Sequence, residues 1–463
     1  MYTVSLHPDA VLHTLRGGVG ASWHALHHDL PLHRERYDFP CRLIAPRGSA
    51  FGGNPPAGDS AAWAQITRHA AWLGLNFIRV EIDQRMYAPA AGVFDWENDE
   101  MQALYRILDH CEAAGADVFL QQMWMHTDWN SFPGVHPLIS APRSMAHYTA
   151  ANMALLHHLV SQRNYTCIRY FCLTNEPPGG TWGYWWSAGS WPEVPVALAW
   201  ADMSAALERS GLPVVLAGPD WTSLPPCEPE KMPFASHFGA IDIHSYDGIG
   251  REKLPRVQQW AQWAHAQNKP FFITEIGNMS LGWGGNHPGP ASRAAALSNA
   301  ADMLLGFQAG VDGFNRWSFT NRGDLDGQWQ LIRTWDTATQ TYLTDIVPEP
   351  EAYFGFGMVS RFLAKYSSVV ACHSSAPDHL ICTAVKSPAG DLTLWLLNLS
   401  PDPISVEVSV AGAPRNWYRY AHPTAAPWQV NPEPWTGPGI TAAALSVTVL
   451  STLFLAGDGN GVT

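Results

Sequence analysis

The sequence predicts an α/β protein, a (β/α)8 TIM barrel followed by a C-terminal antiparallel β-sandwich, from three observations. Between residues 16 and 317, short apolar runs alternate with amphipathic segments of helical length, which is typical of parallel βα units. After Pro348 the pattern changes to alternating runs such as 392–396 and 406–408, separated by Pro and Gly, which favours an antiparallel sheet. The 463 residues leave room for a barrel of about 250 residues or more and one further module.

The barrel elements can be placed in order along the chain. We expect eight strands, at 18–23, 76–82, 117–124, 167–174, 213–217, 240–245, 270–275 and 313–317. Helices are expected between them, at 60–73, 97–114, 144–162, 194–210, 254–267 and 291–309. Glycine readily takes the left-handed conformation that ends a helix. It follows several of these segments, at Gly74, Gly115, Gly211 and Gly310.

Three regions follow from this pattern. Residues 1–15 alternate weakly and could donate a strand to the sandwich, residues 16–347 form the barrel, and residues 348–463 form the sandwich. Long loops follow three barrel strands, at 47–59, 177–195 and 321–335, and the first two are rich in Gly, Pro and Trp. Barrel active sites lie among the loops at the C-terminal ends of the strands, so these loops are expected to wall the site.

Composition and charge exclude several functions. With 46% hydrophobic and 14% charged residues, the chain can bury a large core and is not disordered by composition. A formal net charge of −13 argues against nucleic-acid binding and against anionic membranes, because both need basic patches. We therefore expect no nucleic-acid or membrane partner, and a neutral substrate. The sequence does not indicate an oligomeric state.

The cysteines and the N-terminus indicate a reducing compartment. The seven cysteines are odd in number and scattered, which favours buried thiols over a disulfide framework or a zinc site. No secretory signal is visible at the N-terminus, so we expect a cytoplasmic protein. The one apolar stretch long enough to consider as a membrane span, 440–456, is interrupted by Ser and Thr and is better explained as sandwich strand.

Two glutamates stand where predicted barrel strands end. Glu176 follows the fourth strand in the segment Asn175-Glu176, and Glu275 ends the seventh. Since the C-terminal ends of barrel strands converge on one face, the two carboxylates could flank one bond of a substrate. Glycoside hydrolysis needs such a pair, one to protonate the leaving oxygen and one to attack or to direct water. This chemistry requires no metal or organic cofactor.

At these residues the chain resembles clan A of the glycoside hydrolases, the (β/α)8 retaining enzymes of the cellulase-like family five, the β-xylosidase-type family thirty-nine and the family thirty type. The resemblance covers nearly the whole barrel. It rests on Asn175-Glu176, on Glu275, on residues 74–79 entering the second strand, on residues 243–246 of the sixth strand and on Trp317 ending the eighth.

The resemblance implies a role for each matching residue. Glu176 would be the general acid/base, Glu275 the nucleophile, and Asn175 a ligand of the sugar 2-hydroxyl. Arg79 would hold Glu275 ionised, and Tyr246 would donate a hydrogen bond to it. Glu176 would then lie in a less polar environment than Glu275. The resemblance also implies a cis peptide bond after Trp317.

Other polar residues near strand ends leave alternatives open. His24, His126 and His244 could bind sugar hydroxyls or serve as scaffold. Together with the glutamates they could instead hold a metal, although no His-x-His pair follows the first strand. Two further carboxylates, Glu81 and Asp83, share the strand parity of Arg79 and are rivals to the pair.

Several tryptophans could form a sugar platform, because an aromatic face packs against the apolar face of a pyranose. Trp317 is the best candidate for the floor of the reactive subsite, with Trp124, Trp182 and Trp185 as weaker candidates. Regular strand alternation would point Asn175 and Glu176 in opposite directions. The resemblance needs both in the site, so we expect an irregular strand end there.

The resemblance therefore implies a retaining β-glycosidase that acts through a covalent intermediate on Glu275. We expect exo action on a short oligosaccharide or glycoside, because long loops could close one end of the cleft. The alternatives are an endo-glycanase or transglycosylase on the same scaffold, a non-catalytic carbohydrate-binding protein, and a metal-dependent TIM-barrel enzyme. The sugar itself cannot be read from the sequence.

Overall fold

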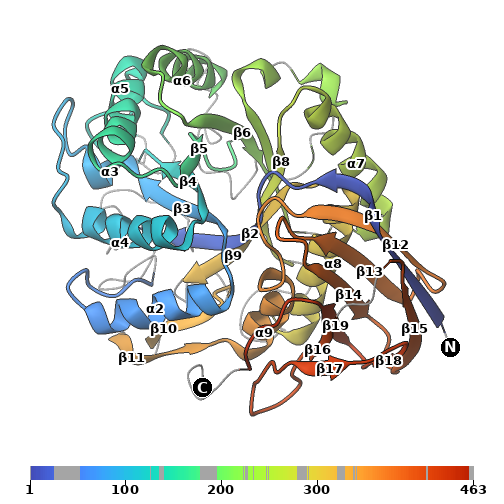
Figure 1. Ribbon diagram of the computed structural model, residues 1–463. Helices are drawn as coiled ribbons and strands as arrows, with labels where there is room; N and C mark the ends of the chain where they lie inside the picture. The colour runs from blue at the N-terminus through green and yellow to red at the C-terminus, as the bar shows by residue number, and fades with distance from the viewer. Residues whose placement is uncertain are drawn as a thin grey trace.

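The computed structural model describes residues 2–25, 53–125, 127–134, 140–177, 196–222, 224, 228–232, 234–246, 248, 250–278, 289, 291–320, 329–336, 339, 341–412 and 416–457. Within these residues, eight parallel strands close into a barrel, in which β9 pairs with both β8 and β2 (Figure 1). The strands are β2 (Val19–His24), β3 (Phe77–Asp83), β4 (Asp117–Trp124), β5 (Ile168–Cys172), β6 (Val215–Trp221), β7 (Ala240–Ser245), β8 (Phe271–Ile276) and β9 (Gly313–Thr320). The predicted barrel and its eight strands are confirmed.

Helices occupy the predicted positions between the strands. They are α2 (Ser60–Trp72), α4 (Asp99–Ala114), α5 (Met145–Leu156) with its π-helical continuation η1 (His157–Gln162), α6 (Val196–Ser210), α7 (Gly250–Ala266) and α8 (Arg293–Ala309). Short helices also occur at α3 (Gln84–Tyr87), η2 (Pro229–Lys231) and η3 (Ala235–His237). Side chains of Asp59, Asn98 and Ser292 cap the N-termini of α2, α4 and α8.

One predicted loop contains regular structure. We expected a loop over 321–335, but Ile332–Asp336 forms strand β10, which pairs with β11 (Thr341–Pro348) and extends the sheet beyond β9. Ile332 and Trp335 are buried, so the hairpin covers apolar surface beside the barrel. Helix α9 (Pro350–Ser360) follows and is buried along most of its length.

The barrel interior changes from apolar to polar along its axis. Side chains alternate between the faces of a strand, so Phe77, Arg79 and Glu81 of β3 all point inward, at successive levels. At the lowest level Phe77 and Phe272 pack with their ring centroids 4.7 Å apart, in a cluster with Phe119, Cys172, Ala217 and Ala240. Above this apolar floor lie buried polar side chains, including Arg79, Gln121, Asp242, Thr274 and Asn315.

The second part of the molecule is a nine-stranded, mostly antiparallel sheet folded around its own apolar core (Figure 1). β1 (Tyr2–Thr14) lies inside this sheet, antiparallel to β12 and parallel to β15. The other strands are β12 (Ser368–Ser374), β13 (Leu380–Lys386), β14 (Leu392–Asn398), β15 (Ile404–Val410), β16 (Trp417–Ala421), β17 (Glu433–Trp435), β18 (Gly439–Ala442) and β19 (Ser446–Ser451). The predicted sandwich is confirmed, while the domain limits at 16–347 and 348–463 stay predictions.

The stretch at 440–456 contributes β18 and β19 to this sheet. Among the residues that the structure describes, no helix has the length and apolarity needed to cross a membrane. Five cysteines fall within the same residues and are free thiols, Cys111, Cys167, Cys172, Cys372 and Cys382. The cellular location stays a prediction.

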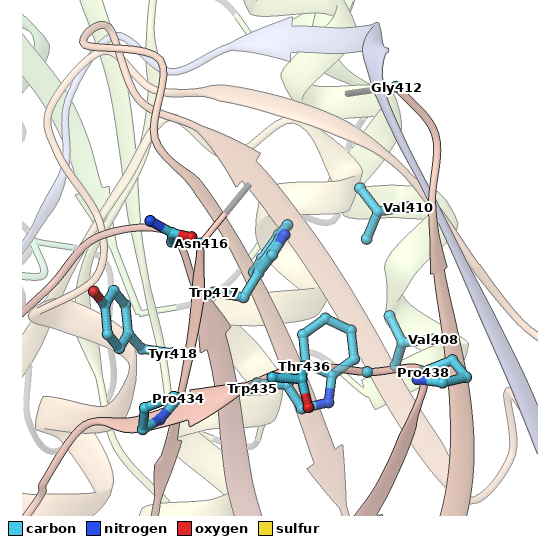
Figure 2. A pocket seen from close by; sticks show the side chains of 11 residues that line it. Val408, Val410, Gly412, Asn416, Trp417, Tyr418, Pro434, Trp435, Thr436 and Pro438 are labelled. Carbon is cyan, nitrogen blue, oxygen red and sulfur yellow. The ribbon is translucent and has the colours of Figure 1, made fainter. Parts of the chain in front are cut away.

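The aromatic residues of the sandwich divide into two groups. Trp428 stacks on Phe354 of α9, with ring centroids 5.7 Å apart, and therefore packs against the barrel side. By contrast, Trp417 and Trp435 meet edge to face at 6.0 Å and line an open groove of about 780 Å³ (Figure 2). This groove is lined entirely by residues 408–438 of the sandwich, so it is separate from the polar interior of the barrel.

Candidate active site

Glu176 is placed by an irregular strand end. β5 ends at Cys172, and Glu176 takes a left-handed conformation with a φ of 47°. A non-glycine residue in this conformation costs about 1 kcal/mol, and a hydrogen bond offsets the cost, since the Glu176 N–H donates to Asp220 Oδ2 at 2.9 Å. The predicted irregularity is confirmed. It brings both Asn175 and Glu176 to the top of the barrel, where they are 5% and 6% exposed.

Glu275 lies on β8 between two partners. Arg79 Nη1 is 2.5 Å from Glu275 Oε1, and the Tyr246 hydroxyl donates a hydrogen bond to Oε2. Both contacts are those that the resemblance implies. Arg79 also pairs with Glu81 and donates to Asn175 Oδ1 at 2.9 Å. One buried guanidinium therefore fixes the relative positions of Glu275 and Asn175.

His244 bridges the two glutamates. Its Nδ1 lies 2.6 Å from Glu176 Oε1 and 3.3 Å from Glu275 Oε2, while its Nε2 lies 2.9 Å from Asp220 Oδ1. One carboxylate oxygen of Glu176, one of Glu275 and a ring nitrogen of His244 all lie within 4.8 Å of one another. The two glutamates predicted from separate strand ends thus share one site.

The pKa of Glu275 differs from the one that the resemblance implies. Burial raises the pKa of Glu275 to about 7, even though Arg79 and His244 act to lower it. Burial alone would lower the pKa of His244, but Glu275 and Asp220 raise it well above its ordinary value. The resemblance implied that Arg79 would hold Glu275 ionised and that Glu176 would lie in a less polar environment. Instead, burial dominates at Glu275, and Glu176 lies against the His244 ring.

His24 and Trp317 form the side of the site next to Arg79. His24 pairs with Glu81, and its ring meets the Trp317 ring edge to face, with centroids 4.8 Å apart. The guanidinium of Arg79 lies 5.9 Å above the Trp317 ring. The peptide bond between Trp317 and Ser318 is cis, as the resemblance implies.

The two rival carboxylates have other partners. Glu81 is fully buried and engaged by Arg79 and His24. Asp83 lies 3.5 Å from Arg85 and precedes α3. Both therefore act as partners of neighbouring cations. The remaining candidates, namely His126, Trp182, Trp185 and the side chain of Trp124 at the end of β4, lie outside the described part of the structure.

One residue of this cluster, Asp220, was not predicted from the sequence. The predicted strand stopped at residue 217, before Gly218-Pro219, whereas β6 continues to Trp221. The Gly218–Pro219 bond is cis, and Asp220 has a φ of 60°. A carboxylate directly after Gly-Pro at a strand end was the signal that could have identified it.

Glu176, His244 and Glu275 offer ligand atoms close enough for a metal ion. The donor set does not favour one, however, because both oxygens of Glu275 are engaged, one by Arg79 and the other by Tyr246. A divalent cation would lie beside a guanidinium and experience its repulsion. The arrangement suits proton transfer and carboxylate attack better than metal binding.

Comparison of the whole fold identifies similar structures. A glycoside hydrolase family 30 subfamily 8 xylanase from Clostridium acetobutylicum is 16% identical, with a TM-score of 0.63, over 97% of this chain and 99% of that one. The catalytic domain of a family 30 xylanase from Talaromyces cellulolyticus is 15% identical, with a TM-score of 0.65 and the same coverage. A family 39 β-xylosidase from Caulobacter crescentus is 13% identical, with a TM-score of 0.59, again over 97% and 99%. At these identities the matches support the fold.

Sequence comparison assigns the family. No curated protein matches the chain, but the family model described as cellulase (glycosyl hydrolase family 5) matches residues 45–307. This region contains Arg79, Glu176, His244 and Glu275, and it is more than half of the 463 residues. The protein therefore belongs to the cellulase family, glycosyl hydrolase family 5, and is a glycoside hydrolase with a carbohydrate substrate.

Proposed function

We propose that this protein is a retaining β-glycosidase in which Glu275 is the nucleophile and Glu176 the general acid/base. The observation that carries the proposal is the approach of the two carboxylates, which have oxygens within 4.8 Å of each other. Retaining enzymes hold their carboxyl groups about 5–5.5 Å apart, whereas inverting enzymes leave about 6.5–9.5 Å for a water molecule. The observed approach favours the retaining mechanism.

The two carboxylates have surroundings that suit different roles. Glu275 is fixed by Arg79 and Tyr246, both of which stabilise its ionised form. A fixed carboxylate can attack the anomeric carbon as the bond to the leaving oxygen breaks. Glu176 contacts a ring nitrogen of His244 and can give its proton to that oxygen. It then takes a proton from the water that releases the sugar from Glu275.

Asn175 and Trp317 would bind the sugar in the reactive subsite. Asn175 Oδ1 is held by Arg79, which leaves its amide group to meet the sugar 2-hydroxyl. Trp317 is 7% exposed and lies beside His24 and Arg79, where its ring could support the apolar face of a pyranose. The Asn175 amide and the Trp317 ring are both uncharged and favour a neutral sugar, in agreement with the net negative charge of the chain.

The choice between exo and endo action stays a prediction. The loops that led us to expect exo action fall mainly at 178–195 and 321–328, outside the described residues. Structures of this fold carry names of xylanases, a β-xylosidase and an endo-β1,6-glucanase. Aryl β-xylosides and β-glucosides, with the corresponding oligosaccharides, are therefore the first substrates to examine.

The test is hydrolysis of a panel of aryl β- and α-glycosides by the wild type, Glu275→Ala and Glu176→Ala. Loss of the nucleophile should lower kcat/KM by at least ~10³-fold. Azide should restore turnover in both variants, with opposite product configurations. In Glu275→Ala, azide would attack the sugar from the face that Glu275 uses in the wild type and would give an α-glycosyl azide. In Glu176→Ala, azide would attack the glycosyl-enzyme from the opposite face and would give a β-glycosyl azide.

The matched control is Glu349→Gln, which alters a buried glutamate paired with Arg333 outside the site. It should keep full activity. Activity of Glu275→Ala equal to wild type would contradict the site assignment. Inactivity of the wild type on every glycoside and oligosaccharide, together with sugar binding, would favour a non-catalytic carbohydrate-binding protein. Products extended by an added acceptor alcohol would indicate a transglycosylase.

A further inference from the structure

We propose that Asp220 is a positioning residue for the acid/base, holding Glu176 both through the His244 ring and through the Glu176 peptide N–H. This inference rests on the proposed function, because it assigns a partner to the residue that transfers the proton. Asp220 is not one of the residues on which the family resemblance rests. Its place is defined by the geometry at the end of β6.

Both oxygens of Asp220 accept hydrogen bonds from the site. Oδ1 lies 2.9 Å from His244 Nε2, and Oδ2 accepts from the Glu176 N–H at 2.9 Å and from Gln121 Nε2 at 3.2 Å. Gln121 also donates to the Thr174 carbonyl. The carboxylate therefore fixes the irregular chain before Glu176 as well as the ring against which Glu176 lies.

Asp220 also determines which ring nitrogen of His244 can gain or lose a proton. A carboxylate only accepts, so His244 Nε2 carries a hydrogen toward Asp220. The opposite nitrogen, Nδ1, is 2.6 Å from Glu176 Oε1. Protonated Glu176 can donate to a neutral ring there, and ionised Glu176 can accept from a cationic ring. Both arrangements hold one proton between Nδ1 and Oε1, so the contact keeps in place the proton that Glu176 gives to the leaving oxygen, and the water that later releases the sugar returns it.

The charged groups around this chain of contacts are consistent with an ionised Asp220. Burial alone would raise the pKa of Asp220, but His244, Arg79 and the Glu176 N–H lower it. The neighbouring Asp242 behaves in the opposite way, since burial and Asp220 raise its pKa well above the ordinary value. Asp242 therefore keeps its proton, with Thr274 Oγ1 donating to its Oδ2 at 2.9 Å. The other titratable groups that face the cluster are Glu275, Tyr246 and Cys172.

Asp220→Asn tests the inference, because it keeps the shape and removes the charge. The substrates are the methyl, 4-nitrophenyl and 2,4-dinitrophenyl β-glycosides of the sugar that the panel identifies. General acid catalysis contributes about 10²–10⁴-fold, and a methoxide leaving group needs it most. We expect kcat/KM to fall by ~10²-fold for the methyl glycoside and by less than about fivefold for the dinitrophenyl glycoside. The pH dependence of the methyl glycoside reaction should also change.

Asp242→Asn is the matched control. It lies beside Asp220 in the same buried layer, and an amide there replaces a carboxyl group that is already neutral. It should lower kcat/KM about equally for all three glycosides, and by less than about threefold, since no charge is lost. A merely structural effect of substitution in this layer would appear in both variants and would not depend on the leaving group.

Three further measurements keep the outcome decisive. If Asp220→Asn does not fold, as judged by circular dichroism, His244→Gln should reproduce its dependence on the leaving group. If both fold, their effects on the methyl glycoside should be non-additive in the double variant. Glu176→Ala must show the same leaving-group dependence, and if it does not, the proposed acid/base is wrong rather than the role of Asp220. An equal loss on all leaving groups in Asp220→Asn, or no loss, would overturn the inference.

Discussion

At the scale of single residues, Glu275 experiences two opposing influences. Burial favours its neutral form, while Arg79, His244 and the Tyr246 hydroxyl favour the carboxylate. Strand-end positions can be read from a sequence, so the place of Glu275 was predictable, and the family resemblance implied its contacts with Arg79 and Tyr246. The degree of burial depends on the whole barrel, so the direction of the change in the Glu275 pKa could not be predicted. Asp220 was not predicted, because it lies three residues beyond the predicted strand end at 217.

The raised pKa of Glu275 predicts the acidic limb of the pH profile. The nucleophile works only when ionised, and kcat/KM reports the ionisations of the free enzyme. Activity should therefore be low below the pKa and rise as pH increases through about 7. Tyr246→Phe removes a donor to the carboxylate, so the limb should move to higher pH. A wild-type limb near the ordinary glutamate value of about 4.3 would contradict this prediction.

At the scale of elements, the strands and helices were predictable because apolar periodicity and helix-ending glycines are local signals. Strand ends were less accurate, as β5 ends two residues before the predicted limit at 174 and β6 ends four residues after 217. Pairing between neighbouring strands decides these ends. The hairpin of β10 and β11 was missed, although Ile332 and Trp335 of β10 are buried in the folded protein.

Close packing of β2 against β3 gives a prediction for an element. A Cβ atom at Gly20 would lie 1.7 Å from the Phe77 carbonyl oxygen and 2.6 Å from its carbon. These are backbone atoms of the adjacent strand and cannot move without disturbing the barrel. Gly20→Ala should therefore lower the free energy of unfolding by about 3 kcal/mol or more, measured by urea denaturation. Gly58→Ala, where nothing lies within 4 Å, is the control and should change stability by less than about 0.5 kcal/mol.

At the scale of the whole molecule, the sandwich is joined to the barrel through α8 and α9. Gln308 of α8 donates to the Cys382 carbonyl at 2.7 Å, and Trp395 of β14 donates to the Met358 carbonyl at 2.9 Å. The sequence indicated two parts of different periodicity. It could not indicate which helix faces join them, because a helix face buried by another module resembles one buried by its own barrel.

Arg293 of α8 is the clearest test of this junction. It pairs with Glu351 at 2.9 Å and donates to the Leu445 and Pro423 carbonyls at 2.8 and 3.1 Å. Arg293→Leu should lower the free energy of unfolding by about 1–3 kcal/mol, because several partners lose a charged donor together. Activity at low temperature should be unchanged. Arg419→Leu removes an exposed pair with Glu433 and should have little effect; equal effects of the two variants would contradict the prediction.

The position of β1 also has a consequence for synthesis on the ribosome. Thr14 of β1 contacts Ser368 of β12, a separation of 354 residues, so β1 leaves the exit tunnel long before β12 and β15 exist. Until then its backbone donors and acceptors lack their sheet partners, and an unpaired strand of this kind can pair with other chains. The barrel strands can all form while β1 is still unpaired. Nascent chains arrested after the barrel should therefore depend more on chaperones than the finished protein does.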